Sequence, residues 1–194
     1  MNAVALTGGI ASGKSTVAGL LQAHRVPLLD TDSVAADLSR PGGRAIPALR
    51  DAFGAECLTV DGALDRPRMR EQAFVDDNAR LRLESILHPL IREEVEVFIS
   101  SHLEERCAVA IPLFFESLGY RARFAEVVAV DCARSIQHER LVRDRGMAPA
   151  LAEAILNVQV PRSIRLQLAD RVLSNNTDLE TLAIQVERWV GAWR

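Results

Sequence analysis

The sequence predicts an α/β fold in which five parallel strands form one sheet flanked by helices. Two observations predict this class. Short apolar runs recur along the chain, and segments of helical character separate them, at residues 3–7, 26–30, 107–112, 127–131 and 172–173. The run at 107–112 is almost continuously apolar, which is typical of a parallel strand buried on both faces. Strands that alternate with helices indicate a parallel sheet.

A phosphate-binding motif follows the first strand at once. Residues 8–15 read GGIASGKS, and an apparently helical stretch begins at Thr16. This is the G-x-x-x-x-G-K-[ST] loop in the strand–loop–helix context that supports it. The glycines permit a tight turn and close approach to an anion, and the amides at the helix start add favourable partial charge. The sequence therefore predicts a P-loop NTPase fold that binds a nucleoside triphosphate.

The lysine of this motif is the only lysine in the chain, against 22 arginines. A compact ammonium fits between phosphates where a wide guanidinium does not, so this usage favours a functional Lys14 over an ordinary surface lysine. We expect Lys14 to reach the β- and γ-phosphates and the Ser15 hydroxyl to bind Mg²⁺.

Composition limits the partners and the compartment. The 194 residues are 48% hydrophobic and 25% charged, which suits one globular unit with an insertion. The net charge of −3 gives no global sign of a nucleic-acid or membrane partner. The three cysteines, Cys57, Cys107 and Cys132, lack metal-like spacing and indicate a reducing compartment. With no signal peptide and no apolar run long enough to cross a bilayer, we expect a cytoplasmic protein.

Two acids follow the second strand. Asp30 and Asp32 flank Thr31, at an edge where ligands bind in open α/β sheets. One reading is that Thr31 or Asp32 caps a helix that begins near Ser33. Two acids favour the functional reading instead, in which a carboxylate deprotonates an attacking hydroxyl or holds Mg²⁺ through water.

The rest of the chain divides into a core, an insertion and a lid. The core is expected over 1–32, 104–134 and 168–194, and a helical, acceptor-binding insertion over about 33–103. In that insertion Pro89 should kink or restart a long helix and leave His88 at the break. Residues from about 135 to 167 form an arginine-rich lid in which two helices precede Pro161. Arg140 is the best candidate there to neutralise charge on a transferring phosphoryl group.

Three further positions carry polar groups with more than one reading. Glu116 follows the third strand and is either a helix-start acid or a contact to substrate or to Mg²⁺-bound water. Asp131 ends the fourth strand, and we expect it to cap the helix at Ser135. Thr177 with Glu180 predicts a capping box for the last helix.

Taken together, these residues resemble the dephospho-coenzyme A kinase family, and the resemblance runs nearly end to end. The matching stretches are 6–10 through Thr16, DTD at 30–32, LHPLI at 87–91, PLFFE at 112–116, Gln137, Arg140-Leu141, Gln159, Ala169-Asp170, Val172 and Asn175. The loop is shared by a whole superfamily, whereas LHPLI and PLFFE are far more specific.

The resemblance implies transfer of the γ-phosphoryl group of ATP to the ribose 3′-hydroxyl of dephospho-coenzyme A, the last step of coenzyme A synthesis. It also implies that Asp32 is the base, that Arg140 is a lid arginine, and that His88 and Glu116 lie at the acceptor. The residues implied to hold ATP are Ala11, Ser12, Gly13, Lys14, Ser15 and Thr16, with Asn175 near the adenine.

Three departures from the family pattern stand out. Ala11 occupies a position that is usually glycine, and 143–145 reads Arg-Asp-Arg where an acid-arginine-acid run is usual. We therefore assign no role to Arg143 or Arg145. Thr177 replaces a common glycine, which leaves the adenine contacts near Asn175 open.

Two other functions are consistent with the motif. One is a different small-molecule kinase, for a nucleoside monophosphate or a sugar acid, which shares the core chemistry. The other is a nucleotide-dependent switch, which would hydrolyse ATP slowly and have no acceptor. The paired acids and the arginine-rich lid favour a kinase over a switch.

Overall fold

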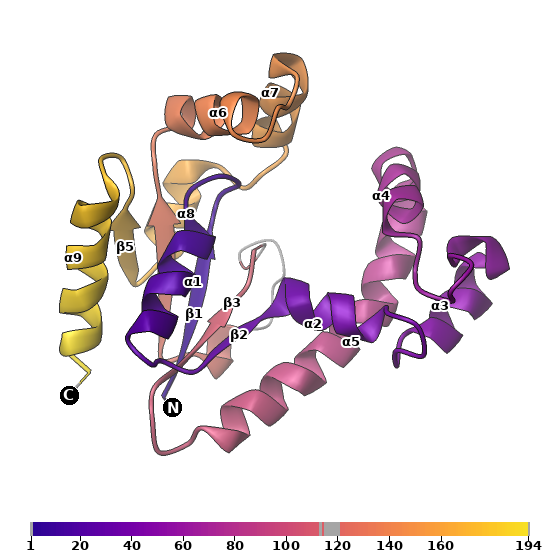
Figure 1. Ribbon diagram of the computed structural model, residues 1–194, viewed down its shortest axis with the longest axis horizontal. Helices are drawn as coiled ribbons and strands as arrows, with labels where there is room; N and C mark the ends of the chain where they lie inside the picture. Colours follow the sequence, from indigo (N-terminus) through magenta and orange to yellow (C-terminus); the bar gives the residue numbers. More distant parts are fainter. Residues whose placement is uncertain (1, 113, 115–120, 194) are drawn as a thin grey trace. The chain divides into compact units, whose positions relative to one another are not determined.

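The predicted five-stranded parallel sheet is present in the computed structural model, which describes residues 2–112, 114 and 121–193. Its strands are β1 (Ala3–Gly8), β2 (Leu28–Asp30), β3 (Cys107–Ala110), β4 (Glu126–Asp131) and β5 (Arg171–Ser174). The strand order is β2-β3-β1-β4-β5, with β1 parallel to β3 and β4, and β4 parallel to β5 (Figure 1). The carboxyl ends of these strands therefore share one edge of the sheet.

Helices connect the strands, and the chain divides into two compact units. The helices are α1 (Lys14–Ala23), α2 (Thr31–Leu38), α3 (Ile46–Phe53), α4 (Arg66–Val75), α5 (Asp77–Ser101), α6 (Arg134–Arg143), α7 (Pro149–Asn157), α8 (Arg162–Leu168) and α9 (Leu179–Gly191). Two short 3₁₀ turns are η1 (Ala55–Cys57) and η2 (Arg121–Arg123). The first unit comprises Met1–Leu29 and Ser101–Arg194, and the second comprises Asp30–Ser100.

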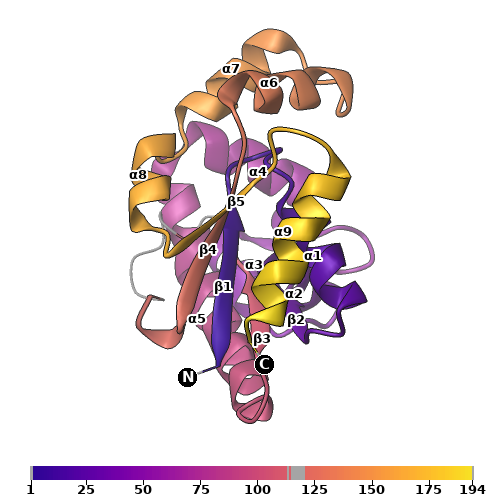
Figure 2. The ribbon, with the colours of Figure 1, turned by 90° about the vertical axis from the view of Figure 1, so that its left-hand side faces the viewer.

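The core of the first unit lies between the sheet and one layer of helices. Figure 2 shows α1 and α9 side by side on one face of the sheet, with α8 on the other face. Alternate residues of β1, such as Val4 and Leu6, are fully buried in this layer with Val17 and Leu21 of α1. Trp189 of α9 completes the cluster, and its indole Nε1 donates a hydrogen bond to the Glu126 carboxylate at 3.0 Å.

The second unit is helical, with local signals at each helix start. Asp65 caps α4 by accepting a hydrogen bond from the backbone N–H of Arg68 at 3.1 Å. Asp76 accepts from the backbone N–H of Asn78 at 2.9 Å, at the start of α5, as its sequence position predicts. Arg44 pairs with Glu93 and Glu94 of α5, which fastens the loop before α3 to the long helix.

Two local expectations are wrong. α5 runs through Pro89 without a restart, so His88 lies within the helix and is half-buried. A kink of the helix at Pro89 stays a prediction. The segment after Pro161 forms a third short helix, α8, beyond the two that were expected. The last helix is capped by Asp178, which accepts from the backbone N–H of Thr181 at 2.7 Å, and not by Thr177.

That hydrogen bond lowers the pKa of the Asp178 carboxyl. A carboxylate at the first turn of a helix also meets the positive end of the helix dipole, which explains why Asp178 prevails over the neutral hydroxyl one residue earlier.

Replacing Trp189 tests this packing. Trp189 is 2% exposed, and its ring meets that of Trp193 edge-on with centroids 4.8 Å apart. Trp189→Ala should lower the free energy of unfolding by about 3–5 kcal/mol, because it leaves a cavity and removes one hydrogen bond from the Glu126 carboxylate. Urea unfolding followed by circular dichroism measures the change. Leu179→Ala on the same helix, at a site that is 61% exposed, should stay within about 0.5 kcal/mol of the parent; equal losses would contradict this account.

Candidate active site

The phosphate loop joins β1 to α1 through two residues in the left-handed region. Ala11 has φ 57° and Gly13 has φ 102°, and the backbone N–H of Ser12 closes the turn onto Gly9 O at 3.0 Å. α1 then begins at Lys14, directly after a glycine that has no side chain to cap it. The first N–H groups of a helix have no partner within the helix, so this end of α1 suits an anion.

Asn175 holds the backbone of the phosphate loop in place. It is buried in the turn after β5, and its Nδ2 donates a hydrogen bond to Ser12 O at 2.8 Å. A Cβ atom at Gly13 would lie 2.1 Å from that Nδ2, so only glycine fits there. The structure therefore brings Asn175 to the phosphate loop, while its expected adenine contact stays a prediction.

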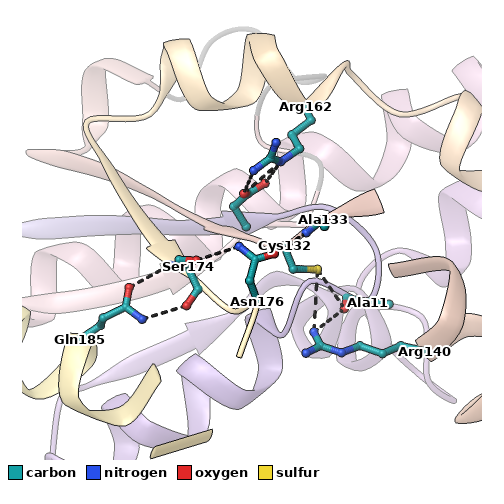
Figure 3. Close-up of polar contacts among 9 residues, drawn as sticks. Ala11, Cys132, Ala133, Arg140, Arg162, Ser174, Asn176 and Gln185 are labelled. Atoms are coloured by element: carbon teal, nitrogen blue, oxygen red, sulfur yellow. Dashed lines mark hydrogen bonds and ion pairs between the residues drawn. The ribbon is translucent and has the colours of Figure 1, made fainter. Parts of the chain in front are cut away.

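Arg140 of α6 also bonds to both the phosphate loop and the turn after β5. Its Nη1 donates to Ala11 O at 3.2 Å and to Ser12 O at 3.5 Å, and its Nη2 donates to Asn175 O at 3.3 Å. The guanidinium also lies 3.8 Å from the Cys132 sulfur (Figure 3). Arg140 thus carries its positive charge onto the backbone of the loop.

Residues of α6 and of the segment after α7 hold the other end of the loop through Ile10. Gln137 of α6 donates to Ile10 O at 2.6 Å, and the Ile10 N–H donates to Gln159 Oε1 at 3.1 Å. The side chains of Ile10 and Ala11 pack against a small apolar cluster formed by Leu141, Ala152 and Leu156. Residues before, within and after α7 therefore fix the conformation of the loop.

Asp131 pairs with an arginine and does not cap α6, so that expectation is wrong. Arg162 Nε contacts the two carboxylate oxygens at 2.8 and 3.0 Å, and Nη2 contacts Oδ2 at 2.6 Å (Figure 3). A guanidinium fork binds a carboxylate more strongly than one backbone amide does. At the start of α6, the Asn176 side chain accepts a hydrogen bond from the Ala133 N–H at 2.7 Å instead. The hydrogen bonds to Asp131 raise the pKa of Arg162.

Burial accounts for the cysteines. Cys57, Cys107 and Cys132 are all buried and form no disulfide. Burial raises the pKa of the Cys132 thiol, and the charge of Arg140 opposes this rise. The thiol therefore remains protonated near neutral pH and acts as a small packing group beneath Ala11.

In the second unit, Asp30 and Asp32 have different tasks. Asp30 caps α2, because its Oδ1 accepts from the Asp32 N–H at 2.9 Å. Neither Thr31 nor Asp32 is the cap, since both lie inside the helix. Asp32 is exposed in the first turn of α2, directly after the carboxyl end of β2.

The remaining predicted site residues lie at the following positions. His88 is half-buried on α5, and Glu116 lies outside the described residues. Ser15 and Thr16 are exposed in the first turn of α1. Within residues 2–112, 114 and 121–193, no three His, Cys, Asp or Glu side chains gather as a metal-binding set. Over the same residues, no helix is long and apolar enough to span a membrane.

Sequence reasoning missed two arginines of α8. Arg162 pairs with Asp131, and Arg165 is buried beside Gly9. The arginine excess over 133–168 was the available signal, but it could not show which side chains turn inward.

Gly13→Ala tests the fit between loop and support. The affinity for ATP should fall about 10-fold or more, because a left-handed alanine costs about 1–2 kcal/mol and its methyl group displaces Asn175. Gly62→Ala is the matched control, since Gly62 has φ 84° but open space around it. It should lower stability without changing ATP affinity. Isothermal calorimetry gives both affinities for ATP. An ATP affinity of Gly13→Ala equal to that of the parent would contradict the claim that only glycine fits beside Asn175.

Comparison with known proteins assigns the chain to a family. The family model described as dephospho-CoA kinase matches residues 2–181. The dephospho-CoA kinase of Dechloromonas aromatica is 45% identical over 183 residues, which cover 94% of this chain and 88% of that protein. A crystal structure from Thermus thermophilus superposes with a TM-score of 0.83 at 28% identity, covering 99% of this chain and 97% of the other.

A dephospho-CoA kinase structure from Campylobacter jejuni shares the fold, with a TM-score of 0.72 at 23% identity over 98% of this chain and 96% of that one. The phosphate loop, the side chains that hold it and these matches all indicate the same family. The chain belongs to the dephospho-CoA kinase family, the ATP-dependent enzymes that phosphorylate dephospho-coenzyme A in the last step of coenzyme A synthesis.

Proposed function

We propose that this enzyme transfers the γ-phosphoryl group of ATP directly to the ribose 3′-hydroxyl of dephospho-coenzyme A, with no phosphorylated protein intermediate. The observation that carries the proposal is the phosphate loop, whose left-handed turn opens onto the start of α1 within a chain of this family. Phosphoryl transfer asks little covalent chemistry of a protein, so positioning and charge stabilisation supply most of the rate.

The cationic groups act on the phosphates. Lys14 reaches the β- and γ-phosphates from the first residue of α1, while the amides of Ala11 to Thr16 cradle the chain of phosphates. Arg140 adds positive charge from the loop backbone to which it is bonded. In a low-dielectric site such charges stabilise the transition state more than they do in water.

The residues also suit Mg²⁺. Magnesium in P-loop enzymes takes one protein hydroxyl, and the remaining ligands are phosphate oxygens and water. The Ser15 hydroxyl is exposed beside Lys14 in the first turn of α1, which supports it as that ligand. When bound, the ion neutralises charge on the β- and γ-phosphates.

Asp32 is our candidate for the base that orients and deprotonates the 3′-hydroxyl. Its support is chemical: Asp30 takes over the capping of α2, so capping does not account for the second acid. We assign His88 and Glu116 to the dephospho-coenzyme A site on the family resemblance alone. A cytoplasmic location, where ATP is available, completes the proposal.

One coupled assay separates this function from its rivals. ADP release is measured with ATP and Mg²⁺ in the presence of dephospho-coenzyme A, a nucleoside monophosphate, gluconate, or no acceptor. Rapid release with dephospho-coenzyme A alone is expected. Faster release with another acceptor would assign a different kinase, and slow release in all four conditions would favour a nucleotide switch.

Asp32→Asn tests the proposed base. The turnover number should fall by about 10²–10⁴, the usual size of a general-base contribution, while ATP still binds. Asp37→Asn on the same helix is the control, since Asp37 is exposed and its carboxylate lies 4.0 Å from Arg40. Steady-state kinetics and ATP calorimetry give the two quantities. Near-normal turnover in Asp32→Asn would remove this residue from the role.

A further inference from the structure

We propose that Gln137 of α6 is a positioning residue for phosphoryl transfer, because it turns the backbone N–H of Ala11 toward the nucleotide. This inference rests on the proposed binding of ATP at the phosphate loop. Gln137 is 3% exposed, and its Nε2 donates a hydrogen bond to Ile10 O at 2.6 Å. The Ile10 carbonyl and the Ala11 N–H belong to one peptide group, so a side chain that holds the carbonyl also determines where the N–H points.

The shape of the peptide group sets that direction. A peptide group is planar, and in the trans form its C=O and N–H point to opposite sides. The Ile10 carbonyl faces outward from the loop, onto Gln137. The Ala11 N–H therefore faces the inside of the turn, which is the side on which an anion binds.

The preceding peptide group of the loop is already satisfied at both ends. Gly9 O accepts from the Ser12 N–H at 3.0 Å, and the Ile10 N–H donates to Gln159 Oε1 at 3.1 Å. The Ala11 N–H, by contrast, has no acceptor among residues 2–112, 114 and 121–193. A backbone N–H needs a partner, and a negatively charged oxygen makes the stronger hydrogen bond. A phosphate oxygen therefore suits the Ala11 N–H.

Asn175 has the same relation to Gly13 as Gln137 has to Ala11. Its Nδ2 donates to Ser12 O at 2.8 Å, and that carbonyl shares a peptide group with the Gly13 N–H. The Gly13 N–H likewise has no acceptor in the part of the chain that the structure describes. Ala11 and Gly13 are also the two loop residues in the left-handed region. A side-chain amide thus holds the peptide group that precedes each left-handed residue.

Gly9 makes room for the contact from Gln137. A Cβ atom at residue 9 would lie 2.6 Å from Gln137 Nε2, so a larger residue would displace the side-chain amide. A buried amide is costly to leave without a partner, which favours the contact to Ile10 O whether or not a nucleotide is bound.

Arg134 links the position of Gln137 to α7. It lies one turn before Gln137 on α6, and its Nη2 donates to Glu153 Oε1 at 2.6 Å and to Asn157 Oδ1 at 2.7 Å. Asn157 ends α7, just before Gln159. The two glutamines that hold the loop therefore belong to helices that are bonded to each other.

The orientation of the Ala11 N–H bears on the rate of transfer. A donor that is fixed in advance stabilises developing charge without the cost of reorganisation during the reaction. Without the bond from Gln137, the peptide group between Ile10 and Ala11 can rotate. Ala11 can then leave its left-handed conformation, which is costly for a residue with a Cβ atom, and its N–H loses its aim.

The test follows the Ala11 and Gly13 amides by NMR in the full-length protein labelled with ¹⁵N. In the parent, ATP and Mg²⁺ without acceptor should move both amide proton resonances downfield, because a hydrogen bond to a charged oxygen deshields the proton. Gln137→Met keeps the length of the side chain but removes the donor. In this variant the Ala11 shift should be largely lost, while the Gly13 shift, which depends on Asn175, should be retained.

The same variant should also turn over more slowly. With dephospho-coenzyme A as acceptor, the turnover number of Gln137→Met should fall by about 10², the lower end of the range for losing one preorganised donor. Gln167→Met is the matched control, because it makes the same substitution at an exposed site on α8. It should keep both NMR shifts and the turnover number of the parent.

Two results would overturn the proposal. One is an Ala11 shift in Gln137→Met equal to that in Gln167→Met. The other is an equal loss at Ala11 and Gly13, since a general loosening of the loop affects both amides. Because the NMR samples contain no acceptor, these results do not depend on whether dephospho-coenzyme A is phosphorylated. If neither resonance of the parent moves with ATP, the proposed function fails as well.

Gln137→Asn covers the case in which Gln137→Met does not fold, as judged by its thermal melt. Asparagine keeps an amide but draws the donor back by one carbon–carbon bond, away from Ile10 O. In an asparagine variant with a normal melt, loss of the Ala11 shift alone would establish the positioning role. An Ala11 shift equal to that of the parent would overturn it.

Discussion

The structure depends on one constraint. The phosphate loop is a short turn that must be held in a strained backbone conformation by other parts of the chain. Left-handed φ angles at Ala11 and Gly13 let successive amides face an anion, but they cost free energy at any residue other than glycine. The loop also exposes backbone carbonyls that need donors. Side chains from distant parts of the chain supply those donors and hold the turn in this conformation.

The parallel sheet explains how such distant residues meet. Because all strands end at one edge, the turns after β4 and β5 lie beside the turn after β1. Asn175 reaches Ser12 across 163 positions of sequence, and Arg140 reaches Ala11 across 129. Each contact closes a long loop in the chain, so the rigidity of the site depends on the sheet beneath it.

The sequence predicted the fold well because its signals are local. Apolar runs mark the strands, and the GGIASGKS motif predicts where the turn lies. Asp131 shows why other features escaped prediction. Its position at a strand end suited a helix cap, but the competing partner, Arg162, lies 31 positions away and is brought near only by the fold. Arg165 is a similar case, since one inward-facing arginine among six in its segment has no distinguishing local pattern.

The packing of Ala11 has a consequence for energetics. Its methyl group and the Ile10 side chain rest on the cluster that joins α6 to α7, so the anion-binding turn and those helices share one small core. Thermodynamic linkage then applies in both directions. Whatever free energy a bound nucleotide contributes to ordering the turn also protects α6 and α7 against local unfolding. Conversely, a solvent or substitution that loosens those two helices weakens nucleotide binding.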